Sequence, residues 1–334
     1  MRERQVDKQY PARMRRKGRS LYYVQNQQWT KIGTIEDEQS ALDNYCRLEA
    51  QKKADRSTVA GLALIFRGLL EDPRNPFDLK DSTRKEYLRQ LQPDARLVRV
   101  LGGAKLNQVK PHMIGDYLDC HPAPVSANRE IALLSKMYKY AKRKGWTVSN
   151  PCSDIERNRE RPRTRYVQDW EFAAVRAATS PAIQLAMDMA LLTGLRLGDI
   201  LRIRRVDYDQ QELRVVEGKT DTKVRFTMTS TLYAALNAHK GLRGNVRSFY
   251  IVHTIKGQRY TESGFKAMWQ RLQRRAVRDG ILEQRFTFHD LRAKHATDKD
   301  EERLNAQLAL GHATPEMTKA YIRHPLGRKV DPLK

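Results

Sequence analysis

The sequence is poor in cysteine and in long apolar runs. Its three cysteines, Cys46, Cys120 and Cys152, are far apart and form no CxxC or Cys/His cluster. This argues against a disulfide framework or a zinc site and fits a reducing compartment. The sequence has no run of about 18 apolar residues and no positively flanked apolar leader. We therefore expect a cytoplasmic protein that neither spans a membrane nor is secreted.

What the sequence has in excess is positive charge. Lys and Arg number 63 against 39 Asp and Glu, which gives a formal net charge of +24 over 334 residues. An imbalance of this size requires a polyanion, and nucleic acid is the usual one because each phosphate contact releases condensed counterions. An ordinary charged surface would explain the charge content but not its single sign. The length predicts two or three domains, each with its own core.

The first domain is expected over residues 1–55. Residues 1–20 carry MRERQ and ARMRRKGR with little apolar material, so they are typical of a mobile basic arm. The runs LYYV (21–24) and WTKIGT (29–34) predict a small hairpin or meander. Apolar residues at helical spacing predict a helix from about Asp37.

A helical domain with its linker is expected over residues 56–160. The clearest helix is SANREIALLSKMYKYAKRKG, and Ser82 is the expected N-cap of another, STRKEYLRQL. Asn150 and Pro151 stop the helical pattern. The segment ERNRERPRTR (156–165) then predicts an extended basic linker that lies along a DNA backbone, and the domain boundary falls within it.

Nine basic side chains in these segments are candidate DNA contacts. They lie in the basic arm, in a row with seven-residue spacing on the long helix, and in the linker: Arg13, Arg15, Arg16, Lys17, Arg129, Lys136, Arg143, Arg163 and Arg165. A basic row of this kind is also typical of a solvated helix face, so both interpretations stay open.

Residues 161–334 predict an α-rich domain with one small sheet. A helix at DWEFAAVRAA and an apolar helix, AIQLAMDMALL, precede LRVVE and VRFTMT, whose alternation predicts two strands around the turn GKTDTK. Helices follow at GFKAMWQRLQRRAVRDG, at HDLRAKHATDKD and as a pair around LGHATPEM. The expected fold class of the chain is therefore multidomain and mainly α, with small β-sheets.

Two arginines and a histidine of this domain occur where packing alone does not explain them. Arg196 follows the helix-breaking Gly194 at the end of an apolar segment, where a charge needs a partner or a ligand. His289 and Arg292 are three residues apart, so a helix places both on one face. Guanidinium groups can hold the non-bridging oxygens of a phosphodiester and stabilise the charge that develops during its cleavage.

The segment around LGHATPEM supplies a second histidine and a hydroxyl. Gly311 is expected to end one helix and Thr314-Pro315 to begin the next, which leaves His312 in a tight turn. Tyr321, nine residues after His312, is expected on the second helix. A phenol has an ordinary pKa of about 10, so as a nucleophile it needs adjacent cations or a base, and the histidines can provide both. The combination suggests phosphoryl transfer without a metal.

In this order, TGLRLGDIL, GKTDTK, FHDLRAKHAT and LGHATPEMTKAY resemble the motifs of tyrosine recombinases of the temperate-phage integrase type. The resemblance implies the tyrosine recombinase fold and a set of catalytic residues. These are Arg196, Lys219, His289, Arg292, His312 and the nucleophile Tyr321, with Asp199 as a supporting acid. Lys223 lies in the same turn, and Lys219 is preferred because it directly follows Gly218.

The resemblance also implies the reaction. Tyr321 would attack the scissile phosphate to give a 3′-phosphotyrosyl link and a free 5′-hydroxyl, with no metal, ATP or other cofactor. The two arginines and the second histidine would hold the phosphate. Lys219 would protonate the leaving 5′-oxygen, and His289 would assist proton transfer at the tyrosine.

The implied function is integration and excision of mobile DNA at specific sites in a bacterial host. Residues 1–55 resemble a small β-rich arm-binding domain, and residues 56–160 a helical core-binding domain that completes a clamp around DNA with the catalytic domain, residues 161–334. The implied partners are double-stranded DNA attachment sites, with a homotetramer on synapsed DNA. The accessory partners that the resemblance suggests are an excision factor and a host DNA-bending protein.

Two other classes stay open. LNAQLALGHATPEMTKAYI is also typical of a helix-turn-helix, so a non-enzymatic DNA-binding regulator is the first, although it leaves both arginines unexplained. A metal-dependent nuclease or transposase that uses Asp290, Asp298 and Asp300 is the second, although these acids lie in a charge-rich run. Taken alone, Tyr321, four residues after Met317, is more typical of a buried helical stripe.

Overall fold

The computed structural model describes residues 10–25, 27–72, 77–238, 248–302, 304–311 and 314–324. His312, one of the predicted phosphate ligands, lies outside these residues. The chain divides into two compact units, residues 1–161 and 162–334, which are described separately. In the described part of the chain, no helix is both long and apolar enough to cross a membrane.

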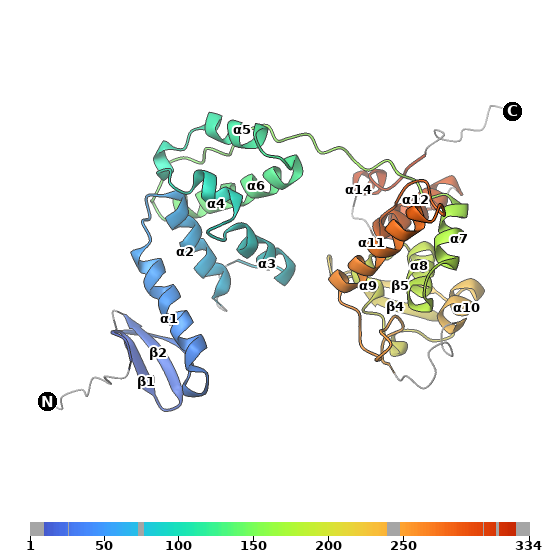
Figure 1. The fold of residues 1–334 in the computed structure, drawn as a ribbon, viewed down its shortest axis with the longest axis horizontal. Coiled ribbons are helices and arrows are strands. Elements are labelled where there is room, and N and C mark those ends of the chain that lie inside the picture. The colour runs from blue at the N-terminus through green and yellow to red at the C-terminus, as the bar shows by residue number, and fades with distance from the viewer. Residues whose placement is uncertain are drawn as a thin grey trace. The chain divides into compact units, whose positions relative to one another are not determined.

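Unit 1 begins with a three-stranded antiparallel sheet packed against one helix (Figure 1). The elements are β1 (Met14–Lys17), β2 (Ser20–Gln25), β3 (Gln28–Thr34) and α1 (Glu38–Lys53). The prediction of a mobile arm is wrong for Met14–Lys17, because each of these residues pairs with β2 and the side chain of Met14 is fully buried. Three of the four residues of this strand, MRRK, are basic, so the sequence pattern did not reveal that Met14 belongs to the core.

The rest of unit 1 is helical, with one apolar core. Its helices are α2 (Val59–Glu71), α3 (Asp81–Gln90), α4 (Arg96–Leu101), α5 (Pro111–Asp119) and α6 (Pro124–Arg143). Helix α6 is the long helix expected from the sequence, and Ile131, Leu134 and Tyr138 are fully buried along it. Ser82 is not an N-cap, because α3 begins one residue earlier, at Asp81.

Unit 2 is built around the apolar helix α8, which packs against α7, α9, α10 and α12. Its first helices are α7 (Asp169–Ala177), α8 (Pro181–Thr193) and α9 (Leu197–Ile200). The predicted hairpin is confirmed as β4 (Glu212–Val216) and β5 (Lys223–Thr227), which pair antiparallel around the turn 217–222. The remaining helices are α10 (Ser230–Ala238), which the sequence did not predict, α11 (Glu262–Arg278), α12 (Phe288–Glu301), α13 (Ala306–Leu310) and α14 (Pro315–Lys319).

The sharp turn after α8 depends on Gly194. This residue has φ +66°, and a Cβ added to it would lie 2.5 Å from the Cδ2 atom of His295 on α12. Both the left-handed backbone and the close approach of α12 therefore require glycine. The chain reverses here and places Arg196 as the residue directly before α9.

Candidate active site

The two arginines predicted to hold the phosphate meet at one carboxylate, that of Glu217. Arg196 Nη1 lies 2.7 Å from Glu217 Oε1, and Arg292 Nη1 lies 3.8 Å from the same oxygen. The side chains of Arg292 and Glu217 are each 2% exposed, whereas that of Arg196 is 17% exposed and can meet a ligand. Burial and then the charge of Arg196 lower the pKa of Arg292, which shows how close the two cations lie.

Backbone carbonyls fix the orientation of Arg292. Its Nη1 donates to the carbonyl oxygen of Gly194 at 2.5 Å, and its Nη2 donates to that of Leu310 at 2.8 Å. The guanidinium group therefore joins α12 to the ends of α8 and α13. A cation held by two fixed acceptors is oriented before any ligand arrives, which is the arrangement that electrostatic catalysis requires.

The phenol of Tyr321 lies beside both a histidine and an arginine. The ring centroids of His289 and Tyr321 are 5.3 Å apart, and Arg292 Cζ lies 5.4 Å from the centroid of the Tyr321 ring. The sequence predicted Tyr321 on the second helix of this pair, and this prediction is wrong. Tyr321 follows α14 in a turn in which its N–H donates to the carbonyl of Thr318 at 2.8 Å. Met317 is 43% exposed, so the two side chains do not form the buried stripe of the packing interpretation.

His289 is neutral at physiological pH. The surrounding protein, and then the charge of Arg292, lower the pKa of the imidazole to about 4, although part of the residue stays accessible to solvent. A neutral ring next to a phenol can accept its proton, whereas it offers no positive charge to a phosphate. The geometry thus suits His289 as a base.

The chain after Tyr321 is anchored to α12. Arg323 is 7% exposed and donates through Nη1 to Asp290 Oδ1 at 2.7 Å and to the carbonyl of Arg165 at 2.5 Å. Its backbone N–H donates to Thr297 Oγ1 at 2.9 Å. This anchor, two residues after Tyr321, limits where the phenol can lie.

Asp199 braces the hairpin turn that carries Lys219. The Asp199 carboxylate is buried, and its Oδ1 accepts from the N–H of Gly218 at 2.9 Å and also from Arg202 Nη2. Lys219 follows in the exposed part of the turn, while Lys223 is the first residue of β5. The backbone before Lys219 is therefore fixed, and its side chain faces solvent.

Several of the predicted DNA contacts have partners within the protein. Arg165 pairs with the buried carboxylate of Glu171, and Arg163 Nη1 donates to Thr287 Oγ1 at 3.0 Å, next to the start of α12. The other contacts are Arg13 with Glu49 at 2.7 Å, Arg129 with Glu160 at 3.1 Å, Lys136 over the ring of Tyr87, Arg143 over the ring of Tyr140, Arg15 with the carbonyl of Met14 and Arg16 with the carbonyl of Gly18; Lys17 is exposed on β1.

The three carboxylates of the metal-dependent alternative do not form one site. Asp290 pairs with Arg323, Asp298 with Lys294 and Asp300 with His324. Among the described residues, no group of three or more His, Cys, Asp or Glu side chains is arranged to hold a metal ion. The acids of this run serve as partners of basic side chains.

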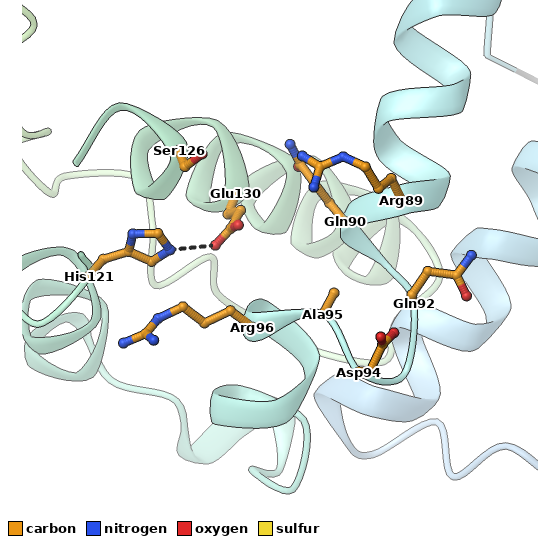
Figure 2. A pocket seen from close by; sticks show the side chains of 9 residues that line it. All are labelled: Arg89, Gln90, Gln92, Asp94, Ala95, Arg96, His121, Ser126 and Glu130. Carbon is orange, nitrogen blue, oxygen red and sulfur yellow. Dashed lines mark ion pairs between the residues drawn. The ribbon is translucent and has the colours of Figure 1, made fainter. Parts of the chain in front are cut away.

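A separate pocket of about 390 Å³ lies within unit 1 (Figure 2). His121 and Glu130 face each other in it, with 3.4 Å between Nε2 and Oε2, and Glu130 also accepts from the hydroxyl of Tyr117. Arg89 pairs with Glu86 at its edge. Its remaining lining residues are Gln90, Gln92, Asp94, Ala95, Arg96 and Ser126. None of these residues belongs to the Arg196 cluster.

Sequence reasoning missed Glu217. The residue directly follows β4, where Leu213 and Val215 face the core. Glu217 continues this two-residue alternation to an inward position, and an acid at such a position needs a cationic partner. An acid at an inward-facing position directly after a strand could therefore have identified Glu217 from the sequence.

Known proteins resemble this chain in sequence. Residues 172–326 match the model of the Phage integrase family. The chain is 25% identical over 276 residues to the prophage integrase IntE of Escherichia coli (strain K12), covering 77% of this chain and 72% of that protein. It is 27% identical over 307 residues to the integrase of Enterobacteria phage 434, covering 88% and 78%.

Solved structures show the same fold. The chain superposes on lambda integrase in a dimer bound to a COC′ core site with a TM-score of 0.65 and 20% identity, covering 100% of this chain and 99% of that one. The protein is a site-specific recombinase of the tyrosine class. Residues 172–326 carry a domain of the phage integrase type, so the expected fold class and the expected resemblance to phage integrases are both confirmed. The regulator and the metal-dependent nuclease are not favoured.

Acid is expected to destabilise unit 2 through His295, which is 5% exposed. Its Nδ1 donates to the carbonyl of Leu191 at 2.6 Å, and burial lowers the pKa of the ring from 6.5 to about 4. The unfolded chain binds this proton first, so the stability that the neutral ring contributes is present above pH 6.5 and is lost as the pH falls towards 4. Relative to His295→Gln, the wild type should lose about 2 kcal/mol more between pH 7 and 4.5 in chemical denaturation. If the free energies of unfolding of the wild type and of His295→Gln changed equally with pH, the assignment to His295 would be wrong.

Proposed function

We propose that Tyr321 is the nucleophile of this recombinase and that Arg196 and Arg292 hold the scissile phosphate, together with His312. The observation that carries the proposal is the placement of the Tyr321 ring beside both His289, at 5.3 Å, and the Arg292 guanidinium, at 5.4 Å. A phenol beside both a neutral base and a cation is arranged to lose its proton and attack phosphorus.

In the proposed step, the phosphoryl group moves from the 5′-oxygen of the DNA to Tyr321. The bond between phosphorus and the 5′-oxygen breaks while a bond between phosphorus and the Tyr321 oxygen forms, which leaves a 3′-phosphotyrosyl ester. His289 receives the proton of the phenol, and Lys219 gives a proton to the leaving 5′-oxygen. The reverse attack by a 5′-hydroxyl of another strand restores the phosphodiester, so the exchange consumes no ATP. The arginines stabilise the added charge on the non-bridging oxygens.

The proposed substrates are double-stranded DNA attachment sites, which the protein would join and separate to integrate and excise mobile DNA. The net charge of +24 supports DNA as the partner. Lambda integrase has been solved as a dimer bound to a COC′ core site and as a tetramer bound to a Holliday junction, which supports a homotetramer on synapsed sites here. An excision factor and a host DNA-bending protein are the accessory partners that we propose.

Trapping a covalent complex tests the proposal. The protein would be incubated with a pool of nicked duplexes from which the cleaved strand end diffuses away, so that the reverse step is lost. We expect a protein–DNA adduct that survives denaturation and forms equally well with excess chelator present. Peptide mapping should place the nucleotide on Tyr321. An adduct on another residue, or one that requires a divalent metal, would refute the mechanism.

The amino-terminal sheet is proposed to bind accessory arm-type DNA sites, as part of a domain over residues 1–55, while residues 56–160 and 161–334 bind and cleave the core site. Arg16 and Lys17 lie exposed on β1. Replacing both by Gln should weaken binding to accessory DNA and reduce the slope of log affinity against log salt by about 2. Cleavage of an isolated core site, measured with the same protein, should not change. An equal loss on both DNAs would contradict the domain assignment.

A further inference from the structure

We infer that Glu217 is a positioning residue for catalysis, which holds Arg196 in place for the scissile phosphate and ties it to the turn that carries Lys219. The inference rests on the proposed roles of Arg196 and Tyr321. It concerns an acid distinct from Asp199, the supporting acid that the motif comparison suggested.

Glu217 joins several elements of the site. Its Oε1 accepts from Arg196 Nη1 at 2.7 Å and lies 3.8 Å from Arg292 Nη1. Its Oε2 accepts from Thr220 Oγ1 at 2.9 Å, one residue after Lys219. One carboxylate therefore contacts the residue before α9 and the hairpin turn, and lies close to a side chain of α12. Displacement of this group would alter the positions of both arginines relative to the turn.

Glu217 is itself held in place. Its side chain is 2% exposed, its N–H donates to the carbonyl of Thr222 at 2.9 Å, and its own carbonyl accepts from the N–H of Asp221 at 2.8 Å. The N–H of the next residue, Gly218, donates to the Asp199 carboxylate. A rigid anchor of this kind orients the mobile guanidinium group bonded to it.

The charge of Glu217 partly balances the charges of the two arginines. Two buried or half-buried guanidinium groups repel each other, and a carboxylate between them offsets the repulsion before DNA arrives. The hydrogen bond occupies one of the five N–H donors of Arg196, so the group can bind Glu217 and a phosphate oxygen together. Glu217 thus prepares Arg196 without taking the place of the phosphate.

The experiment uses two substrates that differ at the scissile linkage. One is ordinary nicked DNA, and the other carries a methylphosphonate there, which has no negative charge for Arg196 to bind. If Glu217 acts through Arg196, Glu217→Gln should lower the rate of covalent complex formation at saturating ordinary DNA by about ten- to a hundredfold. The concentration of DNA at half-saturation should stay the same. On the methylphosphonate the deficit should shrink to a few-fold, as it should for Arg196→Ala.

Two further variants keep the test decisive. Thr220→Val removes the partner of Oε2 at an exposed position and should show a smaller loss with the same dependence on the substrate. Glu212→Gln changes an acid of the same hairpin that pairs only with surface arginines on the described chain, so it serves as the control. The inference fails if Glu217→Gln cleaves ordinary DNA at the wild-type rate, or if its deficit is equal on both substrates. If Glu217→Gln does not fold, equal rates of Thr220→Val and wild type on ordinary DNA overturn it. Absence of any Tyr321 adduct in the wild type would instead refute the proposed function.

Discussion

Tyr321→Phe should abolish the covalent protein–DNA complex and leave DNA binding nearly unchanged. The substitution removes only the hydroxyl oxygen that forms the new bond to phosphorus, while the ring that packs beside His289 and Arg292 remains. Because no other atom can take the place of this oxygen, we expect cleavage to fall by at least about 10,000-fold. Gel separation of the adduct under denaturing conditions, alongside binding isotherms, measures both quantities.

The matched control is Tyr233→Phe. Tyr233 lies on α10, is 41% exposed and belongs to no part of the proposed site. The Tyr233→Phe protein should cleave DNA at the wild-type rate. Residual adduct in Tyr321→Phe at more than a trace would assign the nucleophile elsewhere, whereas loss of DNA affinity in this variant would mean that the hydroxyl contributes to binding.

Arg292→Lys should lose both activity and stability. Lysine keeps the charge, but its single nitrogen cannot bond the carbonyls of Gly194 and Leu310 in the geometry of the planar guanidinium and also bind phosphate. We expect cleavage to fall by about a hundred- to a thousandfold. A buried carbonyl left without a partner should lower the free energy of unfolding by about 1–3 kcal/mol.

The control for this charge-conserving change is Arg275→Lys. Arg275 lies on the exposed side of α11 and donates one hydrogen bond, to the carbonyl of Ala178 at 3.0 Å. Its stability should stay within about 0.5 kcal/mol of the wild type. Rates of adduct formation and thermal unfolding of both variants separate the two effects. An Arg292→Lys protein that cleaves normally would show that charge alone suffices at this position.

The parts of the fold set by local patterns could be predicted from the sequence. Alternation on both sides of GKTDTK determines the β4–β5 hairpin, and the three-residue spacing places His289 and Arg292 on one face of α12. Gly311 and Pro315 act locally, through a left-handed backbone and a fixed φ, so the end of α13 and the start of α14 also follow from the sequence.

The features that depend on distant partners could not be predicted. The role of Glu217 depends on Arg196 and Arg292, which the fold brings close to it. Arg165 forms an ion pair with Glu171, so part of its guanidinium group is already bonded within the protein. The role of Arg323 depends on Asp290, which the sequence shows only as one acid of a charged run. Contacts between residues far apart in the sequence produce no periodic pattern in it, so they could not be predicted.

The attachment of Arg323 sets the reach of the phenol. Two residues of extended chain span about 7 Å, so while the guanidinium group stays between Asp290 and the carbonyl of Arg165, Tyr321 can explore only a short arc around its resting place. A phosphate farther away is accessible only after a buried cation has been pulled out of its acceptors, at a cost of several kcal/mol. Residues 322–323 therefore act as a tether for Tyr321, held by the bonds of Arg323 to Asp290, to the carbonyl of Arg165 and to Thr297, and the phenol moves farther only when these bonds break together.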